Sequence, residues 1–285
     1  MKTKFLLLSS IISIFLISDI CAASDFDGFG NGSKNWSTRR SSKSPQKKVE
    51  KRKNYSCAGS VAKAIGLYNQ KKFGAMEPIL TDAKTQCGGS TIMDTVLYYL
   101  GLSYIKKKRY VEAKSELERM VQDYPYSPFF DDAKFRIGQA VYLQSNPSSK
   151  DQTETNDAIR IFSDILETNP NTKMADSIRY YLNEAKEKIA QKEFENSKFY
   201  EKLKQNESAI VYYRSFINDY PESRYKDQAL LNMANLLIKL DRKSEAIEAL
   251  DELVGTGKDH ELVKKAGILL HDFGADSSTG DSNPE

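Results

Sequence analysis

Cysteines are the residues of this chain whose chemistry is easiest to predict. Cys57 stands at the start of one predicted helix, and Cys87 stands at the end of the next. An antiparallel pair of helices brings these two ends together, so we expect a disulfide between them. The bridge would close a loop of about 30 residues and stabilise the fold by roughly 3–4 kcal/mol in the chain-entropy model. The alternative is two buried free thiols.

The N-terminus is typical of a secretory signal peptide over residues 1–23. Two lysines precede an apolar run from Phe5 to Ile17, and the small residues Cys21-Ala22-Ala23 follow it. The run is too short for a membrane-spanning helix, which needs about 20 residues. Export would bring the chain to an oxidising compartment, where disulfides are permitted.

The third cysteine, Cys21, could be modified during export. Ordinary signal peptidase would cut before Ser24, whereas a lipoprotein signal would make a lipidated Cys21 the first residue of the mature protein. The preceding residues, Ser18-Asp19-Ile20, differ from the small residues of a bacterial lipobox. The local sequence leaves both outcomes open.

Catalytic and metal-binding patterns are missing from the sequence. The two histidines, His260 and His271, lie near the C-terminus without an acid or cysteine to complete a metal site, and we interpret them as solvated residues of a final helix. A nucleophile elbow, a Cys/His pair and a phosphate-binding loop are absent as well. The sequence therefore predicts a non-catalytic protein without metal or cofactor.

Charge is distributed unevenly along the chain. Residues 24–56 are expected to form a disordered basic linker, because their few apolar residues cannot offset the entropy lost on ordering. Residues 24–54 hold nine Lys/Arg against three Asp/Glu, and the chain after them is close to neutral. We interpret the linker as a solvated tether; a second interpretation is attraction to phosphates of anionic lipid or lipopolysaccharide. The near-neutral remainder argues against nucleic-acid binding.

A similar five-residue segment occurs three times: Asp-Tyr-Pro-Tyr-Ser at 123–127, Thr-Asn-Pro-Asn-Thr at 168–172 and Asp-Tyr-Pro-Glu-Ser at 219–223. Proline ends a helix and pushes the preceding residue out of the helical region. We expect the Ser or Thr two residues later to N-cap the next helix. An acid four residues further on, such as Asp131 or Asp227, suits the positive end of that helix dipole.

Small and large apolar residues between these segments recur at the spacing of the 34-residue tetratricopeptide (TPR) pattern. In the clearest unit, Gly101 and Ala113 would let two helices approach closely, and larger residues would fill the groove. The matching positions are Leu97, Leu100, Gly101, Tyr104, Ala113, Leu117, Met120 and Pro125. Strand patterns are absent after Tyr55. The predicted fold is all-α, an α-solenoid of about five TPR-like helical hairpins with one long helix between repeats 3 and 4.

The spacing of the turn prolines locates two irregularities. Successive prolines lie 45 and 51 residues apart. The first excess falls in a loop between Gln144 and Thr155, and the second falls in 173–205, which lacks Gly and Pro and should be one long helix. The predicted array covers 57–272, with repeats at 57–88, 91–125, 127–170, 173–221 and 223–255, a capping helix at 259–272, and a disordered acidic tail at 273–285.

These features resemble the BamD/ComL-like family, the TPR lipoproteins of the outer-membrane β-barrel assembly (BAM) machinery. The resemblance covers about residues 57–255 and is strongest from Ile189 to Ser223; the unit from Ala158 to Thr172 also matches. It implies a scaffold at the periplasmic face of the outer membrane. Its three N-terminal repeats would receive unfolded outer-membrane proteins, and its two C-terminal repeats would dock the last POTRA domain of BamA beside other BAM subunits. Lipidation of Cys21 would anchor it in the inner leaflet.

In relatives, the helix before Pro221 often carries an Arg that pairs with BamA. Tyr212 takes that place here, and Arg214 stands two positions on. The resemblance therefore implies a partner-binding surface that includes Tyr200, Tyr212, Tyr213 and Arg214 but departs from the family's ion pair.

A second function fits an exported TPR array: a periplasmic adaptor that links cell-wall synthesis to envelope constriction, of the Tol–Pal-associated type. That family usually has an N-terminal coiled coil, and residues 24–56 contain no heptads. The sequence therefore favours the assembly scaffold.

Overall fold

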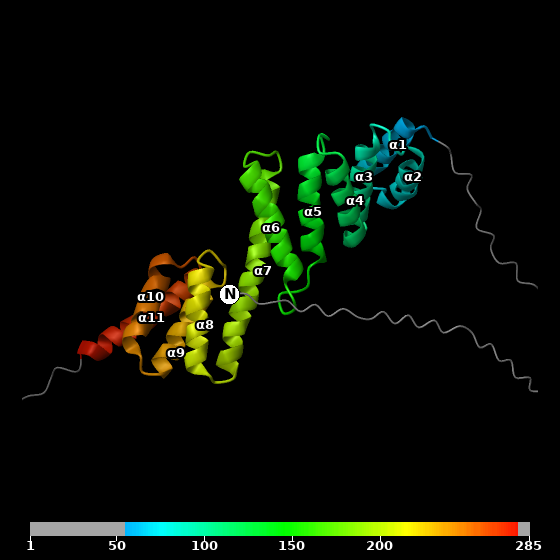
Figure 1. The fold of residues 1–285 in the computed structure, drawn as a ribbon. Coiled ribbons are helices and arrows are strands. Elements are labelled where there is room, and N and C mark those ends of the chain that lie inside the picture. The colour runs from blue at the N-terminus through cyan, green and yellow to red at the C-terminus, as the bar shows by residue number, and fades with distance from the viewer. Residues whose placement is uncertain (1–54, 279–285) are drawn as a thin grey trace, which may run out of the picture. The chain divides into compact units, whose positions relative to one another are not determined.

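The computed structural model of this protein describes the backbone of residues 55–278 and the side chains of residues 55–272. Eleven α-helices and no strands make up this part of the chain (Figure 1). The all-α prediction is therefore confirmed over these residues, whereas the predicted signal peptide, Cys21, the predicted linker up to residue 54 and the chain beyond residue 278 lie outside them. None of the described helices is both long and apolar enough to cross a membrane.

Consecutive helices pair into five hairpins, and each hairpin packs on the next. The bounds are α1 (Cys57–Asn69), α2 (Phe73–Gln86), α3 (Met93–Lys106), α4 (Tyr110–Asp123), α5 (Phe130–Gln144), α6 (Thr153–Thr168), α7 (Ala175–Lys202), α8 (Asn206–Asp219), α9 (Lys226–Lys239), α10 (Lys243–Thr256) and α11 (His260–Ser278). The last helix continues past residue 272, where the capping helix was predicted to end.

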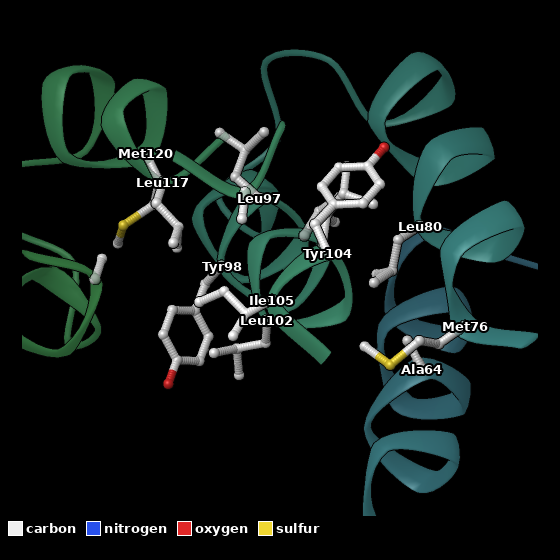
Figure 2. Packing of buried hydrophobic residues seen from close by; sticks show 14 of the residues in the cluster. Ala64, Met76, Leu80, Leu97, Tyr98, Leu102, Tyr104, Ile105, Leu117 and Met120 are labelled. Atoms are coloured by element: carbon white, nitrogen blue, oxygen red, sulfur yellow. The ribbon is translucent and has the colours of Figure 1, made fainter. Parts of the chain in front are cut away.

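Two glycines explain how closely the paired helices approach. A Cβ on Gly101 of α3 would lie 2.5 Å from Cγ of Leu117, and one on Gly138 of α5 would lie 2.6 Å from Cε1 of Phe162. Figure 2 shows the resulting core around α3, with Met76 and Leu80 of α2 on one side and Leu117 and Met120 of α4 on the other. Small residues on one helix therefore receive large ones from its partner, as the TPR spacing predicts.

Helix α7 has 28 residues and measures about 42 Å, and it confirms the predicted long helix. Its first half buries Ile178 and Leu182 in a cluster with residues of α5 and α6. Its second half buries Ala190 and Phe194 in another cluster with α8, α9 and α10. One helix thus closes the third hairpin and opens the fourth.

The serines of the Tyr-Pro turns are not the N-caps that the sequence predicted. Helices α5 and α9 begin three residues after Ser127 and Ser223, and their actual N-cap residues, Phe129 and Tyr225, make no side-chain capping bond. Each serine Oγ instead accepts a 3.2 Å hydrogen bond from the amide two residues on. The reason is that an extra turn precedes each helix. In this turn the amide of Phe130 donates to the carbonyl of Ser127, and the amide of Lys226 donates to the carbonyl of Ser223.

Acids at these turns connect one hairpin to the next. Ser127 donates to Asp94 of α3 at 2.6 Å, and Ser223 donates to Glu187 of α7 at 2.9 Å. Asp227, predicted to face the dipole of its own helix, accepts from the amides of Lys258 and Asp259 at 2.6 and 2.8 Å. These carboxylates therefore order the turn before the following helix.

Cys57 and Cys87 are joined by a disulfide in the structure, with their Cα atoms 5.8 Å apart. The bridge ties the first residue of α1 to the C-cap of α2. Gly88 and Gly89 follow it in place of a proline turn, and Gly89 adopts a φ of 77°, which a glycine tolerates without strain.

Candidate partner-binding surface

Large apolar side chains are exposed where α7 ends and α8 begins. Ten such side chains are exposed among the described residues, and four of them fall within this one stretch: Phe199, Leu203, Val211 and Tyr212. Val211 is 65% exposed, although its neighbours on both sides, Ile210 and Tyr212, pack against other residues. A local concentration of exposed apolar residues is typical of an interaction site.

Tyr200 and Tyr212 form the centre of this stretch. Because α7 and α8 are antiparallel neighbours, the two rings stack with centroids 4.3 Å apart and planes at 14°. Their hydroxyls are 3.1 Å apart, and this hydrogen bond raises the pKa of Tyr212. Phe199 packs edge-on against Tyr200 at 5.9 Å. We call Phe199, Tyr200, Leu203, Val211 and Tyr212 the aromatic tip.

Tyr213 does not belong to this surface, because its side chain is completely buried. Its hydroxyl donates to Oε2 of Glu201 at 2.7 Å and accepts from Nδ2 of Asn232 at 3.0 Å. Burial, reinforced by the bond to Glu201, raises the pKa of this hydroxyl far above its usual range. Tyr213 therefore links α7, α8 and α9 and is out of reach of a partner.

Arg214 also holds helices together. Its guanidinium donates to Glu245 of α10 at 2.6 Å, and Glu245 accepts at 2.7 Å from Arg242. Arg242 contacts Glu207 of α8 at 2.7 Å as well. Hydrogen bonds from Arg242, and then from Arg214, lower the pKa of Glu245. Of the four predicted residues, Tyr200 and Tyr212 meet at the surface, while Tyr213 and Arg214 secure α8.

Sequence reasoning missed Phe199, Leu203 and Val211. One signal could have identified two of them: Phe199 and Val211 are apolar residues whose neighbours one helical turn away are mostly polar, such as Glu195 and Ser215. Leu203 follows α7 as its C-cap residue and carries no such signal. An apolar residue on the polar face of an amphipathic helix has no core to enter.

A groove of about 340 Å³ lies between α4, α5 and α6 and was also not predicted. Its floor is apolar, and its rim carries both signs of charge. The floor is made of Val121, Ile137, Val141, Ile161 and Ile165, and the charged rim of Lys114, Glu118, Lys134, Asp157, Arg160 and Asp164. An apolar floor with a mixed rim suits a segment of polypeptide better than a small charged ligand.

Among the described residues, no group of three or more His, Cys, Asp or Glu side chains is arranged to hold a metal ion. Both histidines are exposed, and Nδ1 of His271 lies 3.9 Å from a carboxylate oxygen of Asp272.

Several known proteins are similar to parts of this chain. The chain is 23% identical over 157 residues to the outer membrane protein assembly factor BamD of Caulobacter vibrioides, a match that covers 55% of this chain and half of that protein. Among solved structures, a thermophilic TPR protein of Thermus thermophilus is 15% identical with a TM-score of 0.35, covering 75% of this chain and 99% of the other. The TPR2AB domain of yeast Sti1, solved with pHSP90, is 17% identical with a TM-score of 0.42, covering 77% and 86%.

A family model described as YfiO, outer membrane lipoprotein, matches residues 68–252. The matched region runs from the end of α1 into α10 and so includes the groove, the long helix and the aromatic tip. Because this region is well over half of the sequence, the chain belongs to the YfiO family of outer membrane lipoproteins.

Proposed function

We propose that this protein is a non-catalytic scaffold for assembly of outer-membrane β-barrels, held at the periplasmic face of the outer membrane. The observation that carries the proposal is the YfiO-family match over residues 68–252. The relative in Caulobacter vibrioides is named an outer membrane protein assembly factor, and this chain aligns with half of it. A TPR array suits a scaffold because its stacked helices form extended surfaces for other proteins.

The aromatic tip is the proposed docking surface for a POTRA domain of BamA. Its exposed rings and aliphatic side chains are of the types that dominate binding energy in protein interfaces. The Tyr200–Tyr212 stack presents them from two packed helices, so little side-chain entropy is lost on binding. Contact at Tyr212 would then be apolar, in contrast to the family's ion pair.

The groove between α4, α5 and α6 is the proposed site for unfolded outer-membrane proteins. Its apolar floor would cover apolar side chains of the client before they reach the membrane, and its rim has partners for charges of either sign. A photo-crosslinker at Thr168, which lines the groove, should capture such clients, whereas one at the exposed Val111 should not. Equal capture at both positions would contradict this assignment.

Affinity purification of the native protein tests the docking proposal. BamA should be recovered with it, and Tyr212→Ala should reduce that recovery at least tenfold, because a central aromatic contact of this kind is typically worth 2 kcal/mol or more. Tyr126→Ala is the matched control, since Tyr126 is 99% exposed on a turn away from the tip. Recovery of cell-wall synthases without BamA would refute the scaffold and favour the constriction adaptor.

Membrane attachment is tested by the intact mass of the mature protein. A triacylated N-terminus at Cys21 is expected for a lipid-anchored scaffold. A mass that starts at Ser24 would show that the protein reaches its place without an acyl chain, and would refute the anchor but not the docking.

A further inference from the structure

The repeat region is close to neutral overall, but its charges are distributed unevenly between two kinds of turn. Counted with one helix residue on either side, the turns inside the five hairpins, at 69–73, 106–110, 144–153, 202–206 and 239–243, contain twelve Lys/Arg and two Asp. Counted in the same way, the turns between hairpins, at 86–93, 123–130, 168–175, 219–226 and 256–260, contain four Lys/Arg and four Asp/Glu. Positive charge is therefore concentrated at the turns inside the first, second, fourth and fifth hairpins, which we call the basic turns; the turn of the third hairpin holds one Lys and one Asp.

The backbone of the basic turns requires an unusual conformation. Lys71, Lys108, Lys204 and Asp241 have φ between 58° and 60°, and they are all the non-glycine residues with positive φ in the described part of the chain. Glycine or asparagine adopts this left-handed conformation at lower cost than lysine. Lysine nevertheless occupies three of the four positions, so its charge is kept at the expense of local stability.

These three lysines also lack partners among the described residues, although charges nearby are paired. Arg109 donates to Glu77 of α2 at 2.6 Å and so joins the turn of the second hairpin to the first hairpin. Arg242 contacts Glu207 at 2.7 Å and joins those of the fourth and fifth. No ion pair within the described structure involves Lys71, Lys108 or Lys204, and all three are exposed. The arginines of the basic turns thus contact the neighbouring hairpin, whereas these three lysines face solvent.

We propose that the basic turns bind the phosphate headgroups of an anionic lipid surface. Lysine dominates them, and its compact, strongly hydrated charge suits a diffuse layer of headgroups better than the fixed geometry of a protein carboxylate. Leu203, half exposed between Lys202 and Lys204, adds an apolar side chain where a membrane interface could accept one. The family is one of outer membrane lipoproteins, so a member attached to the membrane would lie beside a lipid surface. Leu203 belongs to both surfaces, whereas the lysines of the basic turns do not belong to the aromatic tip, so their substitution tests lipid binding separately from docking.

The test compares two variants with the same net charge. Each is made in the exported chain carrying Cys21→Ser, so that no acyl chain contributes to binding. One carries Lys71→Asn, Lys108→Asn and Lys204→Asn. The matched control carries Lys173→Gln, Lys186→Gln and Lys265→Gln, which are exposed lysines outside the basic turns. Co-sedimentation with vesicles of phosphatidylglycerol and phosphatidylcholine at low salt gives the partition coefficient, and phosphatidylcholine vesicles give the uncharged reference.

We expect the asparagine variant to bind the anionic vesicles at least tenfold more weakly, since each lysine near such a surface contributes about fivefold. The control variant should stay within about twofold of the parent, and raised salt should weaken the parent. The asparagine variant should melt at the same temperature as the parent or higher, because strain is relieved. Equal weakening of both variants, or unchanged vesicle binding of the asparagine variant, would overturn the proposal; the latter outcome would leave an acidic protein as the partner of these lysines.

Discussion

The turns at 123–127 and 219–223 share the sequence Asp-Tyr-Pro-x-Ser and the same local hydrogen bonds, but their serines contact acids from different parts of a helix. Ser127 donates to Asp94, the second residue of α3. Ser223 donates to Glu187, near the middle of α7. A repeated sequence therefore fixes the local conformation of a turn, while its tertiary partner depends on the preceding helix.

The length of that preceding helix explains the difference. Helix α3 has 14 residues, all belonging to one hairpin, whereas α7 has 28, and its first half packs on α5 and α6. The part of α7 that faces the next turn begins only near Glu187. The acid that contacts Ser223 is therefore Glu187, at the point in α7 where the helix begins to pack in the fourth hairpin.

The two ends of the array differ in a related way. At the N-terminal end, the Cys57–Cys87 disulfide closes the first hairpin. At the C-terminal end, the carboxylate of Asp227 orders the start of α11. One end relies on a covalent bond and the other on hydrogen bonds, and this predicts different sensitivities.

The largest expected effect is loss of the disulfide. Cys57→Ser with Cys87→Ser should lower the free energy of unfolding by about 3–4 kcal/mol, as expected for a loop of this length. Urea unfolding of the oxidised protein, of the reduced protein and of the variant measures it, and reduction should leave the variant unchanged. Thiol counting on the denatured, unreduced protein should find both cysteines blocked; two titratable thiols would refute the bridge.

The next largest effect on the free energy of unfolding is expected from substitution of Asp94 and Glu187, the acids that contact the two turn serines. Asp94→Ala should destabilise the protein by about 2–3 kcal/mol and Glu187→Ala by about 1–2 kcal/mol, in the range for hydrogen bonds to charged groups. The loss should be larger for Asp94→Ala because Asp94 is buried and also accepts a hydrogen bond from Thr95. Glu187 instead accepts a hydrogen bond from Arg224, which is exposed. The control Glu248→Ala removes an exposed acid in the middle of α10 and should unfold at the same urea concentration as the parent. Equal losses at both turns would show that the position of the acid does not matter.

The smallest effect concerns pH. Hydrogen bonding to Lys107, and also to Arg109, lowers the pKa of Glu77 below its usual 4.5. A carboxylate with a lowered pKa in the folded state contributes stability above about pH 4.5, and this contribution disappears as the pH falls through the lower, folded value. Glu77→Gln should therefore show a shallower fall in melting temperature from pH 5 to pH 3 than the parent.

Glu222 is the C-terminal counterpart. Its pKa is lowered by Lys258, but the pair is exposed to solvent, so screening weakens it. Glu222→Gln should change the pH profile less than Glu77→Gln does. A larger change in Glu222→Gln would mean that exposure is a poor guide to the strength of these ion pairs.

Local sequence determined most of the fold of this protein. Helix starts, stops and lengths depend on proline, glycine and apolar spacing within a few residues, so the hairpins, the loop after Gln144 and the long helix were predictable. The close approach at Gly101 followed from the same pattern, because a small residue opposite a large one is visible in the spacing. Local rules were insufficient at Ser127 and Ser223, where a turn of backbone hydrogen bonds displaced the expected caps.

Only the tertiary structure decided which residues form surfaces. Tyr212 and Tyr213 are adjacent and chemically identical, yet one is partly exposed and the other fully buried, because helix rotation turns them toward different neighbours. Net charge is a sum that ignores position, so the basic turns could not be read from it. The sequence determines the helices by short-range interactions, whereas the juxtaposition of residues far apart in the chain creates the aromatic tip and the groove and brings the basic turns of neighbouring hairpins close to one another.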